Sequence, residues 1–202
     1  MRRIVFGAAL VAVGGFLAAT AGTARADGMD DKKIVVGGDA QFVLPLNSDF
    51  SNGSGPWIGV VAHGGYRITP AFEVTARVGY LAGLSKSQST TIGGQKFSVS
   101  ESISDIPIWI GARYYFMDAP AGLYGAAEIG INAMTGHFSE DGVSASTGET
   151  REGFNVGAGY VISPDVPIDI RVQFMDLNLL GTSSGEPSLL GLGISAGYSF
   201  FF

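Results

Sequence analysis

The chain has 202 residues, a hydrophobic fraction of 46%, 31 glycines and no cysteine. The lack of cysteine excludes a disulfide framework, a cysteine-rich metal site and a lipid-modified N-terminal cysteine. The formal net charge of −6 argues against nucleic-acid binding, which relies on lysine and arginine against phosphate. The sequence contains neither a phosphate-loop pattern nor a calcium-loop spacing, so we expect no cofactor and no metal.

The first segment reads as a targeting sequence. Arg2 and Arg3 precede a long apolar stretch, and Ala24-Arg25-Ala26 ends it with the small-residue pattern of a cleavage site. We therefore predict a cleaved signal peptide over residues 1–26. The remaining residues, 27–202, are expected to form one domain.

Beyond this segment the apolar residues alternate with a period of two, which is typical of strands. In "IPIWIGARYYF" the even positions from Ile106 to Phe116 are apolar or aromatic, and the odd positions include Gly111 and Arg113. Eight segments show this alternation. They are 34–44, 57–68, 72–80, 106–116, 123–133, 153–162, 168–174 and 190–202.

The connections between these strands alternate in length. Three are short and contain prolines, at Pro70, at Pro120 and over Pro164–Pro167. Four are long and polar, namely 45–56, 85–105, 134–152 and 175–189. Short turns at one end and long loops at the other predict an all-β fold, an eight-stranded antiparallel up-and-down barrel.

The composition of the two strand faces predicts which one points inward. The polar face holds most of the strand glycines and all of the strand charges, whereas the other face is large, apolar and uncharged. An eight-stranded barrel has an interior only wide enough for side chains, and a charge facing hydrocarbon is costly. We therefore expect a transmembrane barrel with an apolar exterior and a paired interior charge cluster that plugs the lumen. The predicted members of this cluster are Asp39, Arg77, Arg113, Glu128 and Arg171.

The second long connection keeps a period of two. In 97–104 the serines Ser98, Ser100, Ser102 and Ser104 occupy the positions that are apolar in the following strand. This indicates either a hairpin that projects from the membrane, with backbone edges able to add a partner strand, or a disordered serine-rich loop. The sequence leaves both interpretations open.

The two histidines offer the clearest candidates for catalysis. His63 lies on the inward face of the second strand, where a hydrogen-bonding role is the simpler interpretation. His137 lies with Ser139 and Glu140 in the third long connection, and these are the residue types of a hydrolase triad. Their spacing does not match a recognised active site, so a lipid-modifying enzyme is only an alternative, and the leading prediction is non-enzymatic.

The last strand carries outward aromatic residues up to the final position, including Tyr198, Phe200 and Phe202. It is expected to pair with the first strand, because an open backbone edge cannot be hydrated in lipid. The stretches "GGYRITPAFEVTARVGY", "IPIWIGARYYF", "FNVGAGY" and "AGYSFFF" resemble the small outer-membrane β-barrel family that includes OmpA-type transmembrane domains and OmpX-like proteins.

That resemblance has several implications. It implies a Gram-negative outer membrane, periplasmic termini, and lipid and lipopolysaccharide as surroundings. It also implies that the barrel-assembly machinery reads the C-terminal aromatics. No domain that would anchor the barrel to peptidoglycan is expected after it. The expected role is structural or surface interaction, with an extracellular protein partner at the long loops, and a small pore is the main alternative.

Overall fold

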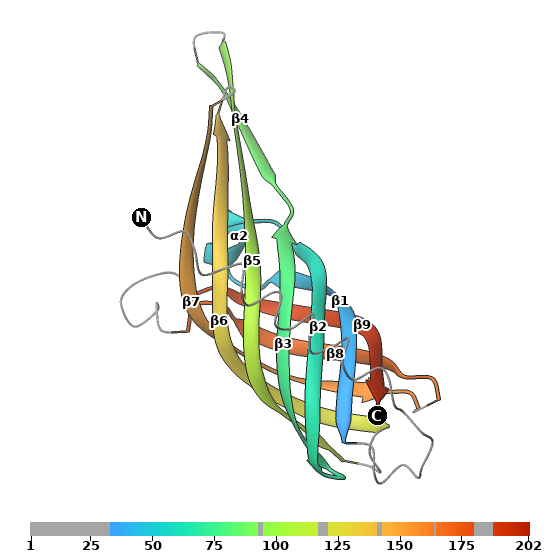
Figure 1. Ribbon diagram of the computed structural model, residues 1–202. Helices are drawn as coiled ribbons and strands as arrows, with labels where there is room; N and C mark the ends of the chain where they lie inside the picture. The colour runs from blue at the N-terminus through green and yellow to red at the C-terminus, as the bar shows by residue number, and fades with distance from the viewer. Residues whose placement is uncertain (1–32, 93–94, 117–120, 141–142, 164, 180–187) are drawn as a thin grey trace.

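The computed structural model describes residues 33–92, 95–116, 121–140, 143–163, 165–179 and 188–202 (Figure 1). The predicted signal peptide lies outside the described residues. The elements are β1 (Ile34–Pro45), α2 (Ser48–Gly53), β2 (Trp57–Thr69), β3 (Phe72–Gly83), β4 (Lys86–Ile92), β5 (Gln95–Tyr115), β6 (Gly122–Glu140), β7 (Val143–Val161), β8 (Ile168–Asp176) and β9 (Leu190–Phe201).

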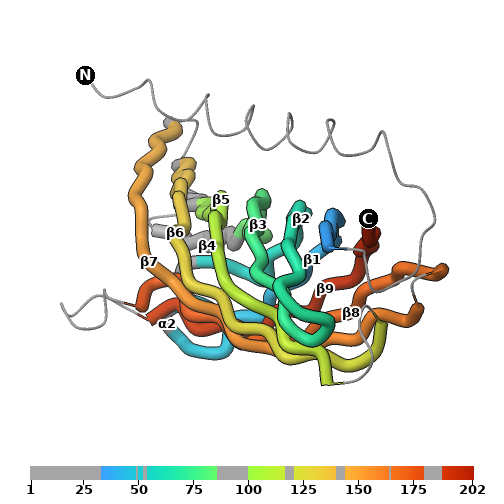
Figure 2. Tube along the Cα trace, turned by 60° about the horizontal axis from the view of Figure 1, so that its bottom comes forward, coloured from blue at the N-terminus to red at the C-terminus, as the bar shows by residue number. Residues whose placement is uncertain are grey.

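The strands close into a barrel. Each strand pairs antiparallel with its neighbour in the order β3-β2-β1-β9-β8-β7-β6-β5, and a further antiparallel pairing between β3 and β5 completes the ring (Figure 2). The first and last strands meet at their ends, where the backbone N–H of Ile34 donates to Phe202 and that of Phe202 donates to Ile34, at 3.0 and 2.8 Å. Eight strands form the wall, which confirms the predicted eight-stranded barrel.

The strands extend further than the sequence predicted. Two segments expected as long polar connections, 85–105 and 134–152, are largely strand, and of the two interpretations of 97–104 the projecting hairpin is the one observed. β4 with the adjoining parts of β5, β6 and β7 forms a four-stranded sheet beyond the barrel rim (Figure 1). We call this part the projecting sheet. Its residues are polar but keep the period of two, and hairpin pairing satisfies the backbone hydrogen bonds that a loop would leave to water.

A short helix, α2, interrupts the first long connection. Asn47 caps it, with its side-chain oxygen accepting from the backbone N–H of Phe50 at 3.2 Å. Among the described residues, no helix is long and apolar enough to cross a membrane.

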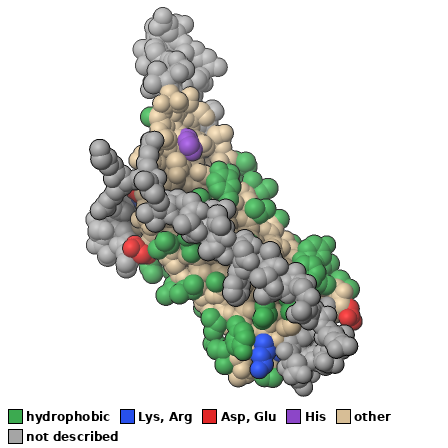
Figure 3. Space-filling model, in the orientation of Figure 1, with side chains coloured by type: hydrophobic (Ala, Val, Ile, Leu, Met, Phe, Trp, Pro, Cys, Tyr) green, Lys and Arg blue, Asp and Glu red, His purple; other side chains and the backbone are tan. Residues whose placement is uncertain are grey.

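The apolar face of the wall points outward, as the composition of the faces predicted. Val60 and Ile129 are 65% and 63% exposed, whereas the inward Arg77 and Glu128 are each 2% exposed. Apolar side chains gather over the barrel wall in Figure 3, while the described surface of the projecting sheet is mainly uncharged and polar. The barrel therefore has the surface of a protein that sits in hydrocarbon.

Glycines on the inward face make room for the larger interior side chains. A Cβ on Gly111 would lie 2.6 Å from Cγ of Glu128, and one on Gly37 would collide with the imidazole of His63. Because an eight-stranded barrel is narrow, large and very small inward residues must alternate around the lumen.

Candidate functional site

The centre of the barrel interior is organised around Glu128, which projects from β6. Arg171 Nη1 donates to its Oε1 at 2.8 Å, and Arg77 Nη1 donates to its Oε2 at 3.2 Å. Asn155 Nδ2 donates to the same Oε2 at 2.7 Å. One carboxylate therefore joins strands β3, β7 and β8 across the lumen, with two charge-assisted pairs.

Arg77 extends this group across the barrel. It donates to Gln173 Oε1 at 3.1 Å and lies 3.5 Å from Asp39 Oδ2. Its guanidinium also lies 5.7 Å from the centre of the Trp109 ring, within the range of a cation–π contact. Of the predicted cluster, Asp39, Arg77, Glu128 and Arg171 thus meet in one place.

Arg113, the fifth predicted residue, belongs to a neighbouring group. It pairs with Asp169 at 3.1 Å and lies 4.9 Å from the centre of the Tyr124 ring. Tyr124 donates its hydroxyl to the same carboxylate at 2.6 Å. Arg113 therefore balances a carboxylate of β8 that the predicted cluster did not include.

A short chain of contacts links the two groups. Asp39 Oδ2 lies 3.2 Å from Nδ1 of His63, and Nε2 of that ring lies 2.9 Å from the hydroxyl of Ser199. Ser199 in turn donates to Asp169 at 2.9 Å. Three buried arginines and three buried carboxylates thereby form one network, in which His63 is an interior hydrogen-bonding residue.

An apolar layer lies inside the barrel at the end from which the projecting sheet rises. Phe50 from α2 packs edge to face on Trp57, with ring centres 5.1 Å apart, and Trp57 Nε1 donates to Ser54 at 2.8 Å. The buried members of this layer are Val43, Phe50, Trp57, Val61, Leu81, Trp109, Met134, Met175, Leu177 and Leu189.

A second, smaller apolar cluster lies at the opposite end of the lumen, beside the short turns. It consists of Val35, Tyr115, Tyr124, Ala126, Val161 and Phe201. Tyr115 donates its hydroxyl to Glu73 at 2.8 Å, so this end also contains a polar contact. The polar network is thus held between two apolar layers.

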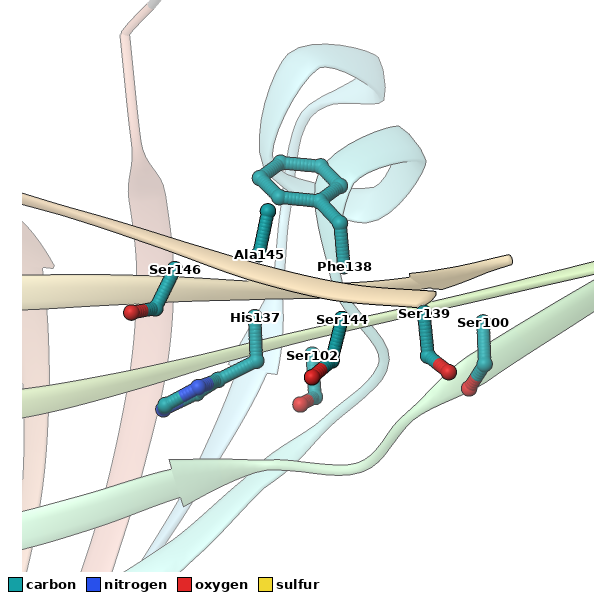
Figure 4. A pocket seen from close by; sticks show the side chains of 8 residues that line it. All are labelled: Ser100, Ser102, His137, Phe138, Ser139, Ser144, Ala145 and Ser146. Atoms are coloured by element: carbon teal, nitrogen blue, oxygen red, sulfur yellow. The ribbon is translucent and has the colours of Figure 1, made fainter. Parts of the chain in front are cut away.

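The projecting sheet contains the other candidate residues. His137 and Ser139 are exposed on the same side of β6, and they help to line a shallow hollow of about 260 Å³ together with serines of β5 and β7 (Figure 4). In the described part of the chain, no hydrogen bond joins His137 to a serine hydroxyl. A triad needs that contact between base and nucleophile.

The aromatic residues of the last strand face outward, as the alternation predicted. Tyr198 and Phe200 are about half exposed and stack with ring centres 6.1 Å apart. Phe202 ends the ladder with its two backbone hydrogen bonds to Ile34. These side chains lie on the lipid-facing surface at the seam between the first and last strands.

Comparison with known proteins fits this geometry. Residues 8–200 match the family model described as an outer membrane protein beta-barrel domain. Ail, the attachment invasion locus protein of Yersinia pestis, shares the fold in its crystal structure with a heparin analogue; the TM-score is 0.50, the identity 13%, and 84% of this chain and 97% of that chain are covered.

The N-terminal β-barrel domain of Pseudomonas aeruginosa OprF gives a TM-score of 0.50 at 13% identity, covering 84% of this chain and 100% of that chain. A comparison with curated protein sequences finds no significant match. The chain belongs to the family of outer-membrane β-barrel proteins, and it resides in the outer membrane of a Gram-negative bacterium.

Proposed function

We propose that this protein is a closed, non-enzymatic barrel that serves a structural and surface-interaction role by displaying the projecting sheet outside the cell. The proposal is supported by the side chains that pack inside the lumen, around Glu128 and around Trp57, together with strands that continue well beyond the barrel wall. A protein built only to conduct needs an open lumen, and a protein built only to fill the membrane needs no projecting sheet.

The contents of the lumen support a plug rather than a pore. Arg77 and Arg171 each lie within hydrogen-bonding distance of Glu128 inside the lumen, and the apolar layer around Trp57 lies next to them. An eight-stranded barrel leaves no wide water channel once such side chains fill it. The small pore remains the second candidate, and conductance measurements distinguish the two.

The arrangement of the chain supports an orientation with the projecting sheet outside. Ile34 and Phe202 meet at the end of the barrel that also carries the short turns. In this orientation, a protease of broad specificity added to intact cells should cut within 85–105 or 134–152. Cleavage confined to the short turns near Pro70 and Pro120 would invert the orientation.

The outer strands of the projecting sheet are suited to a protein partner. Among the described residues, the outer backbone edges of β4 and of β7 above Glu152 pair with no other strand. Such an edge can add an extended segment of another protein through main-chain hydrogen bonds. The Ail structure contains the heparin analogue sucrose octasulfate. The net charge of −6 on this chain disfavours a sulfated ligand of that kind.

The display role is tested by removing the projecting sheet without disturbing the barrel. Replacing 86–102 and 137–148 with short turns should abolish binding of the bacterium to a target surface while leaving heat-modifiable migration on gels intact. A matched control replaces the same residues with glycine-serine linkers of equal length, which keep the chain length but not the strands. Full binding by the truncated variant would contradict the display role.

The C-terminal aromatics have a separate proposed role, as the signal that the barrel-assembly machinery reads. Tyr198, Phe200 and Phe202 lie at the closing seam, so a partner could reach them before β1 and β9 pair. Phe202→Ser should lower the amount of folded barrel in the membrane. Phe116→Ser is the control, because Phe116 is an outward aromatic at the same barrel end but is not terminal. Equal losses in both variants would exclude a specific signal.

A further inference from the structure

The projecting sheet has two different sides. On one side, six residues form two rows across β5, β6 and β7. The rows are Ser102–His137–Ser146 and Ser100–Ser139–Ser144. Their side chains share one side of the sheet, whereas Phe138 and Ala145 point to the other (Figure 4). We call the six residues the hydroxyl face.

The hydroxyl face continues the lipid-facing wall of the barrel. Because alternate residues of a strand share a side, Ser104, Ser102 and Ser100 follow Ile110, Ile108 and Ile106 on the same side of β5. On β6, Thr135, His137 and Ser139 likewise follow Ile129 and Ile131. A molecule whose acyl chains lie along this wall therefore has its polar part next to the hydroxyl face.

The chemistry of the face indicates what that polar part is. Each serine hydroxyl can both donate and accept hydrogen bonds, and an imidazole adds one more polar group. Among the residues whose side chains the structure describes, no lysine, arginine or carboxylate lines the hollow of about 260 Å³. A phosphate or sulfate group would call for a cation such as arginine. An array of uncharged donors and acceptors instead matches the hydroxyl groups of sugar rings.

We propose that the hydroxyl face binds the saccharide part of a glycolipid of the surrounding outer leaflet, namely the sugars of lipopolysaccharide that lie beyond its lipid A. The apolar wall below it keeps the acyl chains of that lipid beside the protein, which raises the effective concentration of the attached sugar. Weak individual hydrogen bonds are then sufficient for occupancy. The inference rests on the outward orientation of the projecting sheet given under the proposed function.

The two histidines provide a direct test, since they are the only ones in the chain. His137 lies in the hydroxyl face, and His63 is 2% exposed inside the barrel. The full chain with ¹⁵N-labelled histidine is placed in phosphatidylcholine nanodiscs that contain lipopolysaccharide, lipid A alone, or neither. We expect the imidazole signals of His137 to shift only with lipopolysaccharide and those of His63 to stay constant in all three.

Variants sharpen the result. Ser102→Ala and Ser146→Ala each flank His137 in its row, and each should raise the lipopolysaccharide concentration for a half-maximal shift by about 2- to 10-fold, the usual effect of one lost hydrogen bond. Thr147→Val is the matched control, because Thr147 is also exposed but lies on the other side of β7 and should change nothing. The His63 signals report whether each variant is folded.

Three outcomes overturn the proposal. These are no shift of His137 with lipopolysaccharide, an equal shift with lipid A alone, and an equal effect of Thr147→Val. A shift of the same size with free oligosaccharide released from that lipopolysaccharide, at the same concentration, would assign the face to soluble saccharide and not to a membrane lipid. The nanodisc test requires neither adhesion nor a fixed orientation in cells, so its failure leaves the display role standing.

Discussion

Strands β5, β6 and β7 run through both the barrel wall and the projecting sheet, yet their polar residues are buried in the barrel interior and exposed or half-buried in the projecting sheet. In the lower part of β6, Glu128 is fully enclosed and holds three hydrogen-bonding partners. Further along the same strand, His137 and Ser139 are exposed to solvent. Polar residues therefore stabilise a fixed arrangement in the lumen, whereas in the projecting sheet they remain available for a ligand.

The largest expected difference between the two regions concerns Glu128. Glu128→Ala leaves Arg77 and Arg171 without their shared carboxylate inside the barrel, which should lower the free energy of unfolding by about 3–5 kcal/mol. Glu152→Ala removes an exposed carboxylate and should change the free energy of unfolding by less than about 0.5 kcal/mol. Urea unfolding from lipid vesicles measures both values. Equal effects would mean that the interior network does not stabilise the barrel.

Two glycine-to-alanine substitutions test how much room each of the two regions has for an added Cβ. A Cβ on Gly111 meets the Cα and Cγ of Glu128 at 2.6 Å, so Gly111→Ala should cost about 1–3 kcal/mol through overpacking. A Cβ on Gly148 in the projecting sheet meets nothing closer than 3.6 Å. Gly148→Ala should therefore be neutral in the same assay, and a penalty as large as that of Gly111→Ala would contradict the described packing.

A double-mutant cycle tests the division of the network into two groups. Arg171→Ala and Glu128→Ala each remove one partner of the same contact at 2.8 Å. The change in the free energy of unfolding of the double variant should therefore differ from the sum of the two single changes by about 0.5–3 kcal/mol. Arg113 pairs instead with Asp169. The effects of Arg113→Ala and Glu128→Ala on the free energy of unfolding should therefore be closer to additive. Additivity for Arg171 and Glu128 would show that they are not energetic partners.

The smallest effects are expected for the hydroxyl face. Ser100 is half-buried and Ser144 is exposed in the projecting sheet. Ser100→Ala and Ser144→Ala should therefore each change the free energy of unfolding by less than about 0.5 kcal/mol. A loss above about 1 kcal/mol, on the scale of a buried hydrogen bond, would make these serines part of the folded framework.

The sequence predicted the wall well because the period of two is a local property of each strand. Arg77, Glu128 and Arg171 could be assigned to the interior from their own neighbours in the chain. Their partners Asn155 and Gln173 could not be named, although both lie at inward positions. Which inward residues meet across a lumen depends on the stagger between strands, and alternation within one strand does not contain that information.

The apolar layer at the projecting end was missed for a different reason. Phe50, Leu177 and Leu189 come from the connections 45–56 and 175–189, where no strand period applies. The polar composition of 85–105 and 134–152 predicts long connections, whereas the alternation that persists over 97–104 indicates the hairpin that the structure contains. The polarity of the residues indicates whether a segment is exposed to water, whereas the period with which residue types alternate indicates whether the segment is a strand.

Conductance in a planar lipid bilayer tests the central claim, that the lumen is closed, most directly. The refolded wild-type chain should show no steady conductance, because the network around Glu128 and the layer around Trp57 fill the barrel. Steady, ohmic channels in the wild-type protein would contradict the closed lumen and favour the small pore.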